Sequence, residues 1–250
     1  MIRVAAVGDV HFGADSAGRL RPHLAHLGER ADMLLLAGDL TKRGLAEEAE
    51  VLADELRDLP VPVVAVLGNH DHESDSADAV VERLGDVGVH VLEGTATTLE
   101  IDGAVVGVAG AKGFGGGFAG ACGSEFGEPE MKAFMRHTAA VAGRLEQALA
   151  SVASADVRIA LLHYAPVETT LEGERLEIYP FLGSYLLAEA VDRAGADVVL
   201  HGHAHAGSER GVTPGGVPVR NVAQPVLGRA YALLCLKAGS TDLSCEPAVH

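Results

Sequence analysis

The sequence predicts an α/β fold built around a parallel sheet. Short apolar runs without polar alternation recur along the chain, which is typical of strands buried on both faces. Stretches with helical character separate these runs, as the crossover connections of parallel strands require. Polar residues follow directly after the apolar runs, at the carboxyl ends where such sheets bind their ligands.

The N-terminal part of the chain predicts a right-handed βαβαβ unit. The expected strands are Ile2 to Val7, Met33 to Ala37 and Pro62 to Leu67, and the expected helices between them are Ser16 to Arg30 and Leu45 to Leu59. The next expected elements are a helix at Asp78 to Leu84 and strands at Val89 to Leu92, Thr97 to Ile101 and Val105 to Ala109. We expect these three strands to extend the first sheet.

The segment Gly110 to Gly127 is rich in Gly and Phe and keeps neither strand nor helix periodicity. It contains a GxGxxG pattern at Gly115, Gly117 and Gly120. The pattern lacks both a βαβ context and an acidic residue near position 140, which disfavours dinucleotide binding. The segment is either a loop that borders an active site or a plain surface loop.

The C-terminal half predicts a second sheet. A long helix at Glu128 to Ser154 precedes a strand at Val157 to Leu162, and a polar and aromatic segment, Glu168 to Tyr185, precedes a helix at Leu186 to Ala194. The last expected strands are Asp197 to Leu200, Val217 to Val222, Ala230 to Leu236 and Thr241 to Cys245. Without an internal repeat or a linker, residues 1–250 are expected to form a single domain.

Composition and charge limit the partners. The chain of 250 residues has a formal net charge of −16, and two divalent cations would remove only four of these charges. An acidic surface disfavours a long nucleic acid and an anionic membrane as partners. The cysteines lack CxxC spacing, which argues against a disulfide framework and fits a reduced cytosol. With no signal peptide and no apolar run of ~18 residues, we expect a soluble, cytoplasmic protein that spans no membrane. The sequence predicts no oligomeric state.

Seven nitrogen and oxygen donors stand at or just past the ends of expected strands: Asp9, His11, Asp39, Asn69, His163, His203 and His205. Residues two apart in extended chain project to the same side, as in the Asp9 and His11 pair. Seven donors are too many for one ion and suit two metals roughly 3.5 to 4 Å apart. A carboxylate must bridge such a pair, and Asp39 is central in the strand order. Imidazole and carboxylate donors together favour Mn, Fe or Zn over Mg or Ca.

Five short blocks that hold these donors resemble the signature of the calcineurin-like metallophosphoesterase superfamily. The blocks are Asp9-Val10-His11, Gly38-Asp39, Gly68-Asn69-His70-Asp71, His163 and Gly202-His203-Ala204-His205. They occur in the family order. The resemblance implies a four-layered α/β/β/α sandwich of two mixed sheets flanked by helices, with a dinuclear metal site.

The resemblance also implies a role for each residue. One metal would take Asp9, His11, Asp39 and His205, and the other would take Asp39, Asn69, His163 and His203. Asp39 would bridge the two metals. His70 would act as the general acid that protonates the leaving oxygen, while a metal-bridging hydroxide attacks phosphorus.

One departure from a branch of the family narrows the function. The protein Ser/Thr phosphatases carry GDxxDR, whereas this chain has Lys42 in place of the second Asp, which orients the general acid in that branch. The Gly-Asp-Leu-Thr and Gly-Asn-His-Asp runs resemble the bacterial cyclic-nucleotide phosphodiesterases instead. The orienting partner of His70 is therefore open, and Asp71 is either that partner or a turn residue.

The leading hypothesis is hydrolysis of a phosphodiester in a small, cyclic-nucleotide-like substrate. The alternatives are a phosphomonoesterase that acts on a small phosphorylated metabolite and a non-catalytic metal-binding scaffold. Candidate contacts to the substrate are the cations Lys112, Arg136 and Arg175 and the rings of Phe114, Tyr164 and Tyr179. For the three cations, the sequence favours the alternative that each is a solvated surface charge. His201 is expected in the core or behind the metal ligands.

Overall fold

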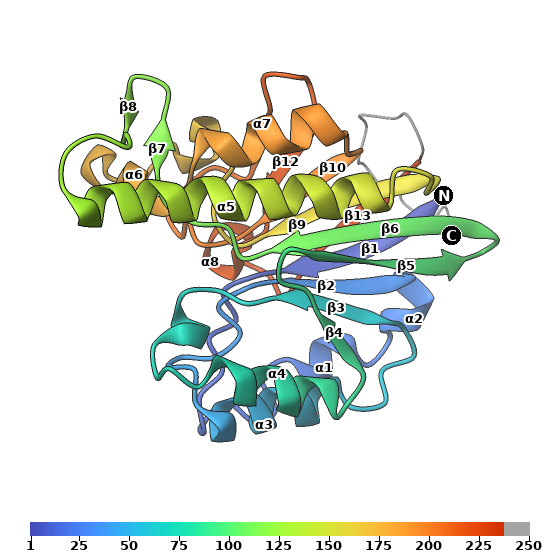
Figure 1. The fold of residues 1–250 in the computed structure, drawn as a ribbon. Helices are drawn as coiled ribbons and strands as arrows, with labels where there is room; N and C mark the ends of the chain where they lie inside the picture. Colours follow the sequence, from blue (N-terminus) through green and yellow to red (C-terminus); the bar gives the residue numbers. More distant parts are fainter. Residues whose placement is uncertain (238–250) are drawn as a thin grey trace.

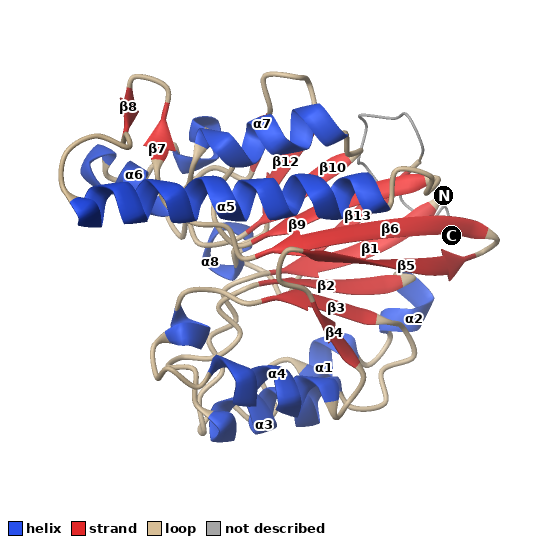
Figure 2. Ribbon diagram, in the orientation of Figure 1, coloured by secondary structure: helices blue, strands red, loops and turns tan. Residues whose placement is uncertain are grey.

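The computed structural model describes residues 1–237. Two large sheets are stacked face to face, and helices cover the outer face of each sheet (Figure 1 and Figure 2). This is the α/β/β/α arrangement with two mixed sheets that the family resemblance implies, and it confirms the expected fold class.

The first sheet has the strand order β13-β1-β2-β3-β4. Its strands are β1 (Ile2–Val7), β2 (Met33–Ala37), β3 (Val63–Val66), β4 (Val89–Val91) and β13 (Ala232–Leu236). The strands β1 to β4 are parallel, and β13 runs antiparallel to β1. The predicted βαβαβ unit is therefore the centre of this sheet.

The second sheet has the strand order β11-β12-β10-β9-β6-β5. Its strands are β5 (Thr95–Ile101), β6 (Ala104–Ala111), β9 (Val157–Leu162), β10 (Val198–His201), β11 (Arg210–Val212) and β12 (Pro218–Asn221). The four central strands, β6, β9, β10 and β12, are parallel. The antiparallel strands β5 and β11 form the two edges.

Three strands belong to a different sheet from the one expected. β5 and β6 were expected in the first sheet, but β6 pairs with β9, with Val106 opposite Val157. β13 was expected in the second sheet, but it pairs with β1, with Val4 opposite Leu234. A short apolar run indicates a buried strand without specifying its partner, so this part of the prediction is wrong. The expected strand Thr241 to Cys245 lies outside the described residues.

The expected helix Ser16 to Arg30 is interrupted. Only α1 (Arg21–Leu24) and α2 (Leu27–Arg30) are helical. The Glu55 carboxylate accepts hydrogen bonds from the backbone N–H groups of Gly18, Leu20 and Arg21. These bonds satisfy the backbone outside a helix and hold the segment against α3 (Ala46–Leu56).

The main core lies between the two sheets. In β2, Met33 and Leu35 face this core, whereas Leu34 and Leu36 face the helical layer. Strand side chains alternate between faces, so one apolar strand contributes to two cores. From the second sheet, residues such as Ile159 meet the first sheet across the same core. The apolar runs have no polar alternation because both faces are buried.

The two helical layers complete the sandwich. The helices α1 to α4, with α4 at Ala77–Gly85, cover the first sheet, and α5 (Pro129–Ser151) and α7 (Tyr185–Ala194) cover the second (Figure 1). The remaining short helices are η1 (His70–His72), η2 (Glu168–Leu171), η3 (Leu176–Ile178), α6 (Tyr179–Leu182) and α8 (Gln224–Leu227). No helix within residues 1–237 has the length and apolar character needed to cross a membrane.

The Gly-rich segment forms a small hairpin, β7 (Gly117–Phe118) and β8 (Ala121–Cys122). The backbone N–H of Gly116 donates to Pro180 O at 2.7 Å, and that of Gly117 donates to Gly183 O at 2.9 Å. The GxGxxG pattern thus packs on α6 and opens no helix, so it lacks the strand-to-helix turn that holds a dinucleotide.

The cysteines differ from the expectation of reduced thiols. Cys235 in β13 is disulfide-bonded. Cys122 in β8 is free and exposed.

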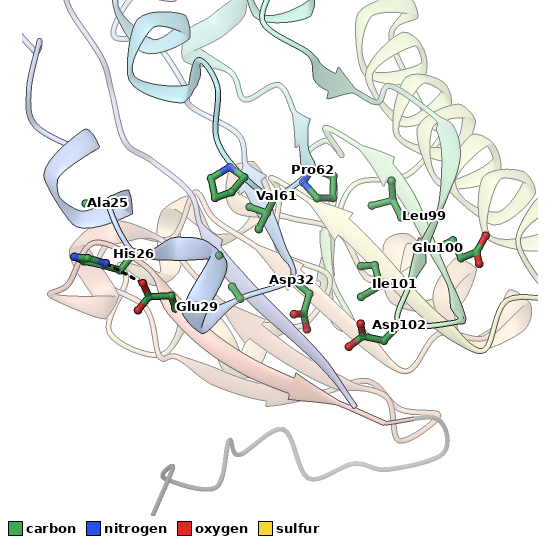
Figure 3. A pocket seen from close by; sticks show the side chains of 13 residues that line it. Ala25, His26, Glu29, Asp32, Val61, Pro62, Leu99, Glu100, Ile101 and Asp102 are labelled. Atoms are coloured by element: carbon green, nitrogen blue, oxygen red, sulfur yellow. Dashed lines mark hydrogen bonds and ion pairs between the residues drawn. The ribbon is translucent and has the colours of Figure 1, made fainter. Parts of the chain in front are cut away.

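A surface hollow of about 640 Å³ lies at the amino ends of β2 and β3 and at the carboxyl end of β5 (Figure 3). Four carboxylates line it, those of Glu29, Asp32, Glu100 and Asp102. Asp32 is paired with Arg3 at 2.5 Å. None of the expected site residues lines this hollow. Those residues follow the carboxyl ends of β2 and β3, at the opposite end of the strands.

Leu35 provides a test of the core between the sheets. It is fully buried, and Leu35→Ala should lower the free energy of unfolding by about 2–5 kcal/mol, because the lost methyl groups leave a cavity. Urea denaturation followed by circular dichroism measures this change. In the control Leu176→Ala, the side chain is 72% exposed, and we expect a change within about 0.5 kcal/mol. Equal effects in the two variants would contradict this packing.

Candidate metal centre

The carboxyl ends of β1, β2, β3, β9 and β10 meet at one end of the two sheets, and all seven expected donors lie in the segments that follow them. Four of the seven come from the first sheet: Asp9, His11, Asp39 and Asn69. The other three come from the second sheet: His163, His203 and His205. The structure brings these donors together in two groups.

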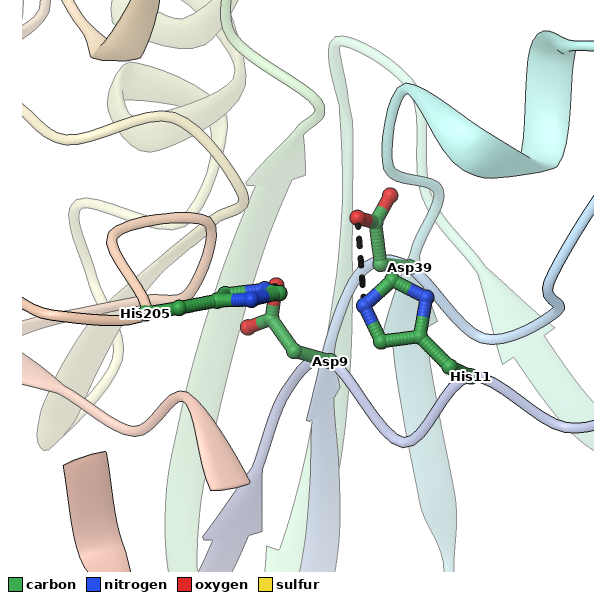
Figure 4. Close-up of side chains that lie close together, drawn as sticks. All are labelled: Asp9, His11, Asp39 and His205. Atoms are coloured by element: carbon green, nitrogen blue, oxygen red, sulfur yellow. Dashed lines mark hydrogen bonds and ion pairs between the residues drawn. The ribbon is translucent and has the colours of Figure 1, made fainter. Parts of the chain in front are cut away.

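The first group contains Asp9, His11, Asp39 and His205, and one donor atom from each lies within 4.8 Å of all the others. Asp9 and His11 come from one segment, and Asp39 and His205 come from two others that lie next to it (Figure 4). His205 Nε2 lies 2.8 Å from Asp9 Oδ1, and His11 Nε2 lies 3.7 Å from Asp39 Oδ2. The set matches the ligands that the resemblance implies for one metal.

The second group contains Asp39, His163 and His203, again with donor atoms within 4.8 Å of one another. Asn69 joins it, because its Oδ1 lies 3.0 Å from His163 Nε2. The Asp39 carboxylate belongs to both groups. Its Oδ1 lies 3.3 Å from His163, and its Oδ2 faces His11. A carboxylate in this position has one oxygen for each of two cations.

Left-handed backbone conformations aim several of the donors. Among residues 1–237, seven non-glycine residues have positive φ, and four of them are expected ligands: Asp9, His11, Asp39 and His203. This conformation costs free energy for a residue with a Cβ atom and persists only where the surroundings enforce it. The sharp turns after the strands therefore place these side chains at the cost of local strain.

Two glycines allow the close approach of the segments. A Cβ at Gly68 would lie 2.1 Å from Asp39 Oδ1, and one at Gly202 would lie 2.3 Å from Asp9 Oδ2. No side chain fits at either position without displacing a carboxylate. This explains physically why glycine precedes the donors in the Gly-Asn-His and Gly-His blocks.

Backbone carbonyls fix the proton on two imidazoles. His163 Nδ1 donates to Ala37 O at 2.9 Å, and His203 Nε2 donates to Phe181 O at 3.2 Å. A carbonyl only accepts, so the other ring nitrogen of each neutral histidine carries a lone pair. In His163 this lone pair faces the Asn69 oxygen, which is also an acceptor. Two acceptors at 3.0 Å are explained by a cation between them.

Burial sets the protonation of the donors. It lowers the pKa of His203 to about 3 and that of His163 well below its ordinary value, so both rings are neutral near pH 7. Burial also raises the pKa of Asp9 to about 6, with the His205 hydrogen bond opposing the shift. That hydrogen bond is the largest cause of the raised pKa of His205. Histidine binds metal as the neutral imidazole, and aspartate binds metal as the ionised carboxylate.

These residues fit a pair of metal ions. His11 Nε2 is buried, and no hydrogen-bond partner for it exists among the described residues. A buried polar atom without a partner is uncommon and calls for an explanation. A cation between His11, Asp39 and the rest of the first group would satisfy it, and mixed nitrogen and oxygen donors suit a transition metal.

His70 lies beside the two groups without belonging to either. Its backbone N–H donates to Asp39 Oδ1 at 2.9 Å, and its ring stands edge-on to the His11 ring at 4.6 Å between centroids. The ring Nδ1 donates to Lys42 O at 2.7 Å. The backbone of Lys42, whose side chain replaces the expected Asp, thus orients the ring and leaves Nε2 facing the site.

Asp71 is a structural carboxylate. It is buried and accepts hydrogen bonds from the backbone N–H groups of Leu40, Thr41 and Gly68 and from the Thr41 hydroxyl at 2.6 Å. It joins the loop after β2 to the loop after β3. Of the two roles left open by the sequence, the contacts match the turn residue and not the partner of the His70 ring.

Three other candidate residues have partners outside the two donor groups. His201 is buried, donates from Nδ1 to Gly202 O at 2.8 Å and lies 2.9 Å from Thr170 Oγ1. Tyr179 is buried and donates its hydroxyl proton to Leu171 O. Arg136 is paired with Glu125 on the surface. Sequence patterns missed the carbonyl groups of Ala37, Lys42 and Phe181, because a backbone acceptor leaves no signal in residue identity.

Known proteins resemble the chain in sequence and in fold. A family model described as calcineurin-like phosphoesterase matches residues 2–207. No protein with a curated description matches the chain. The phosphopantetheinyl hydrolase of Mycobacterium tuberculosis has a similar structure, with a TM-score of 0.61, 17% identity and 88% of each chain covered.

Two further solved structures are similar. The protein TT1561 of Thermus thermophilus gives a TM-score of 0.60 at 21% identity, with 93% of each chain covered. GAP50, the anchor in the inner membrane complex of Plasmodium, gives 0.55 at 14% identity, with 90% of this chain and 72% of that chain covered. At these identities the likeness shows the fold.

Metal loading should stabilise the protein through Asp39. Adding Mn²⁺ to metal-free protein should raise the melting temperature, since a ligand at 100 times its Kd adds about 2.7 kcal/mol of stability. Asp39→Asn should remove most of this increase, and elemental analysis should find two Mn per wild-type chain. Asp58→Asn is the control, because Asp58 has a similar φ of 55° but is exposed and far from the donors in sequence. A full response to Mn²⁺ in the Asp39 variant would contradict the shared carboxylate.

His201 should make the metal-free protein less stable in acid. Burial lowers its pKa to about 4, whereas in the unfolded chain the value is near 6.5. The unfolded state therefore gains a proton first as the pH falls, and the free energy of unfolding should drop by about 3 kcal/mol between pH 6.5 and 4 from this residue. His201→Gln should flatten that part of the profile, measured by urea denaturation at each pH. An unchanged slope would show that His201 does not contribute.

Proposed function

Because the chain belongs to the calcineurin-like phosphoesterase family, we propose that it hydrolyses a phosphodiester bond in a small nucleotide-like substrate, with two metal ions and with His70 as general acid. The proposal is carried by one observation. The Asp39 carboxylate is shared by two groups of donors, and the ring of His70 lies next to it without a place in either group.

The proposed ligands follow the two groups. Asp9, His11, Asp39 and His205 would hold one ion, and Asp39, Asn69, His163 and His203 would hold the other. Mn, Fe or Zn suits these donors. When bound, such a pair of ions provides an activated water and neutralises the charge on the phosphoryl oxygens.

The role proposed for His70 follows from its hydrogen bonds. Lys42 O accepts the Nδ1 proton, so a second proton on the ring can only be held at Nε2. Nε2 lies 3.9 Å from Asp39 Oδ2 and so stands at the edge of the donor groups. From there it donates the proton to the leaving oxygen, which makes the departing group a neutral alcohol.

The acidic chain favours a small substrate. With a formal charge of −16, the protein repels a long polyanion, whereas a single phosphoester needs only the local positive potential of the metal pair. The ring of His70 has 40% of its side-chain surface exposed, so the acid is open to a substrate from solvent.

The acid role of His70 can be separated from metal binding. With Mn²⁺ present, wild-type protein should hydrolyse bis-p-nitrophenyl phosphate, and His70→Ala should lower kcat by about 10²-fold or more, since a general acid contributes about 10²–10⁴. Metal content should stay at two ions per chain. His90→Ala, which changes an exposed histidine in β4, is the control. Retained turnover in the His70 variant would exclude the assigned role.

The preference for a diester is tested with matched leaving groups. Values of kcat/KM for bis-p-nitrophenyl phosphate and for p-nitrophenyl phosphate should favour the diester, measured from p-nitrophenol release at fixed Mn²⁺. A higher value for the monoester would support the alternative, a phosphomonoesterase acting on a small metabolite. Absence of turnover on both, with two ions bound, would instead support a non-catalytic scaffold.

A further inference from the structure

Lys112 stands directly beside the second donor group. It follows β6, and its backbone carbonyl accepts hydrogen bonds from the N–H groups of His163 and Tyr164, each at 3.0 Å. Because β6 and β9 are neighbours in the sheet, the end of one strand is fixed against the end of the other. The position of Lys112 is thus tied to that of a proposed metal ligand.

The ammonium group lies over two aromatic rings. Lys112 Nζ is 5.2 Å from the centroid of the Phe114 ring and 5.4 Å from that of Tyr164. The Tyr164 ring is in turn 4.3 Å from the His203 ring. The sum of the last two distances places the ammonium within about 10 Å of the His203 ring. A ligand held between the metal ligands can therefore extend to Lys112.

No carboxylate among the described residues lies within ion-pair distance of the Lys112 ammonium, although the side chain is half-buried. Glu93 is the nearby acid. It accepts the backbone N–H of Lys112 at 3.2 Å and lies 3.9 Å from Arg144. A cation that has lost part of its water without gaining an anion is costly. The two rings offset part of this cost through cation–π attraction.

The groups around Lys112 favour a negatively charged ligand. After burial, the charge of Lys112 is the largest influence that lowers the pKa of His72 and of His137. The carboxylates that act on Lys112 itself are those of Glu93 and Asp39. Asp39 would be neutralised by the metals that it bridges. Glu93, which also lies 3.9 Å from Arg144, is then the one carboxylate named here that still acts on the ammonium, and the other groups described around it are imidazoles and aromatic rings.

We propose that Lys112 binds a second phosphoryl group of the substrate, one that is not hydrolysed. This inference rests on the proposed function, since the scissile phosphoester would occupy the space between the two donor groups. The further anionic group of a nucleotide-like ester is a phosphoryl group, and an ammonium donates charge-assisted hydrogen bonds to its oxygens. The proposal narrows the substrate class to molecules with two or more phosphoryl groups, such as cyclic dinucleotides, and disfavours cyclic mononucleotides.

The test compares AMP and ADP, which share a base and a sugar and differ by one phosphoryl group. Isothermal titration calorimetry on Mn-loaded protein, with free Mn²⁺ held constant, gives the two Kd values without any need for turnover. Wild-type protein should bind ADP about tenfold more tightly than AMP, a ratio that corresponds to about 1.4 kcal/mol. Lys112→Met should bring the ratio near one, chiefly through weaker ADP binding, and Lys112→Arg should restore most of it.

Arg136→Met is the matched control. It removes a positive charge that is exposed and already paired with Glu125, so the ratio should stay as in wild type. If Lys112→Met does not fold, Lys112→Gln replaces it. Equal affinities of the wild-type protein for AMP and ADP would overturn the proposal. Equal losses of affinity for AMP and ADP in Lys112→Met, or in Lys112→Gln where it is used instead, would also overturn it. Failure of wild-type protein to hydrolyse bis-p-nitrophenyl phosphate is a separate result that overturns the proposed function.

Discussion

A single buried carboxylate, that of Asp39, is in contact with donors from both sheets, and the rest of the centre is arranged around it. Asp39 is 2% exposed and has positive φ, so both its burial and its backbone conformation need support from neighbours. The His70 N–H binds one oxygen, and the absence of a side chain at Gly68 leaves room for it. A buried anion with so few hydrogen bonds needs a positive charge, which explains why the surrounding residues are metal donors.

The support for this carboxylate comes from the loops and not from the strands alone. Asp71 accepts four hydrogen bonds and ties the segment after β2 to the segment after β3. Three backbone carbonyls, those of Ala37, Lys42 and Phe181, orient the rings of His163, His70 and His203. These contacts limit ring rotation before any ligand arrives, so a substrate or metal would meet a site that is already shaped.

Much of this arrangement could be predicted from the sequence because its signals are local. Apolar runs such as Met33–Ala37 indicate buried strands, and the short blocks after them contain the seven candidate donors, six of which lie in the two groups. The sheet assignments of β5, β6 and β13 could not be predicted, because pairing is decided by distant partners such as Val157 for Val106. The break in the first helical segment depends on Glu55, more than 30 residues away. The partner of the His70 ring is a carbonyl, which every residue type possesses.

The division of the donors between the two sheets affects the stability of the protein. The first sheet provides Asp9, His11, Asp39 and Asn69, and the second provides the three remaining histidines. Cations held between the sheets would add further links to two sheets that are already joined by their apolar core and by hydrogen bonds such as that from His163 Nδ1 to Ala37 O. Loss of the ions would remove these added links, so the protein would be less stable and more easily cleaved by proteases when metal is scarce.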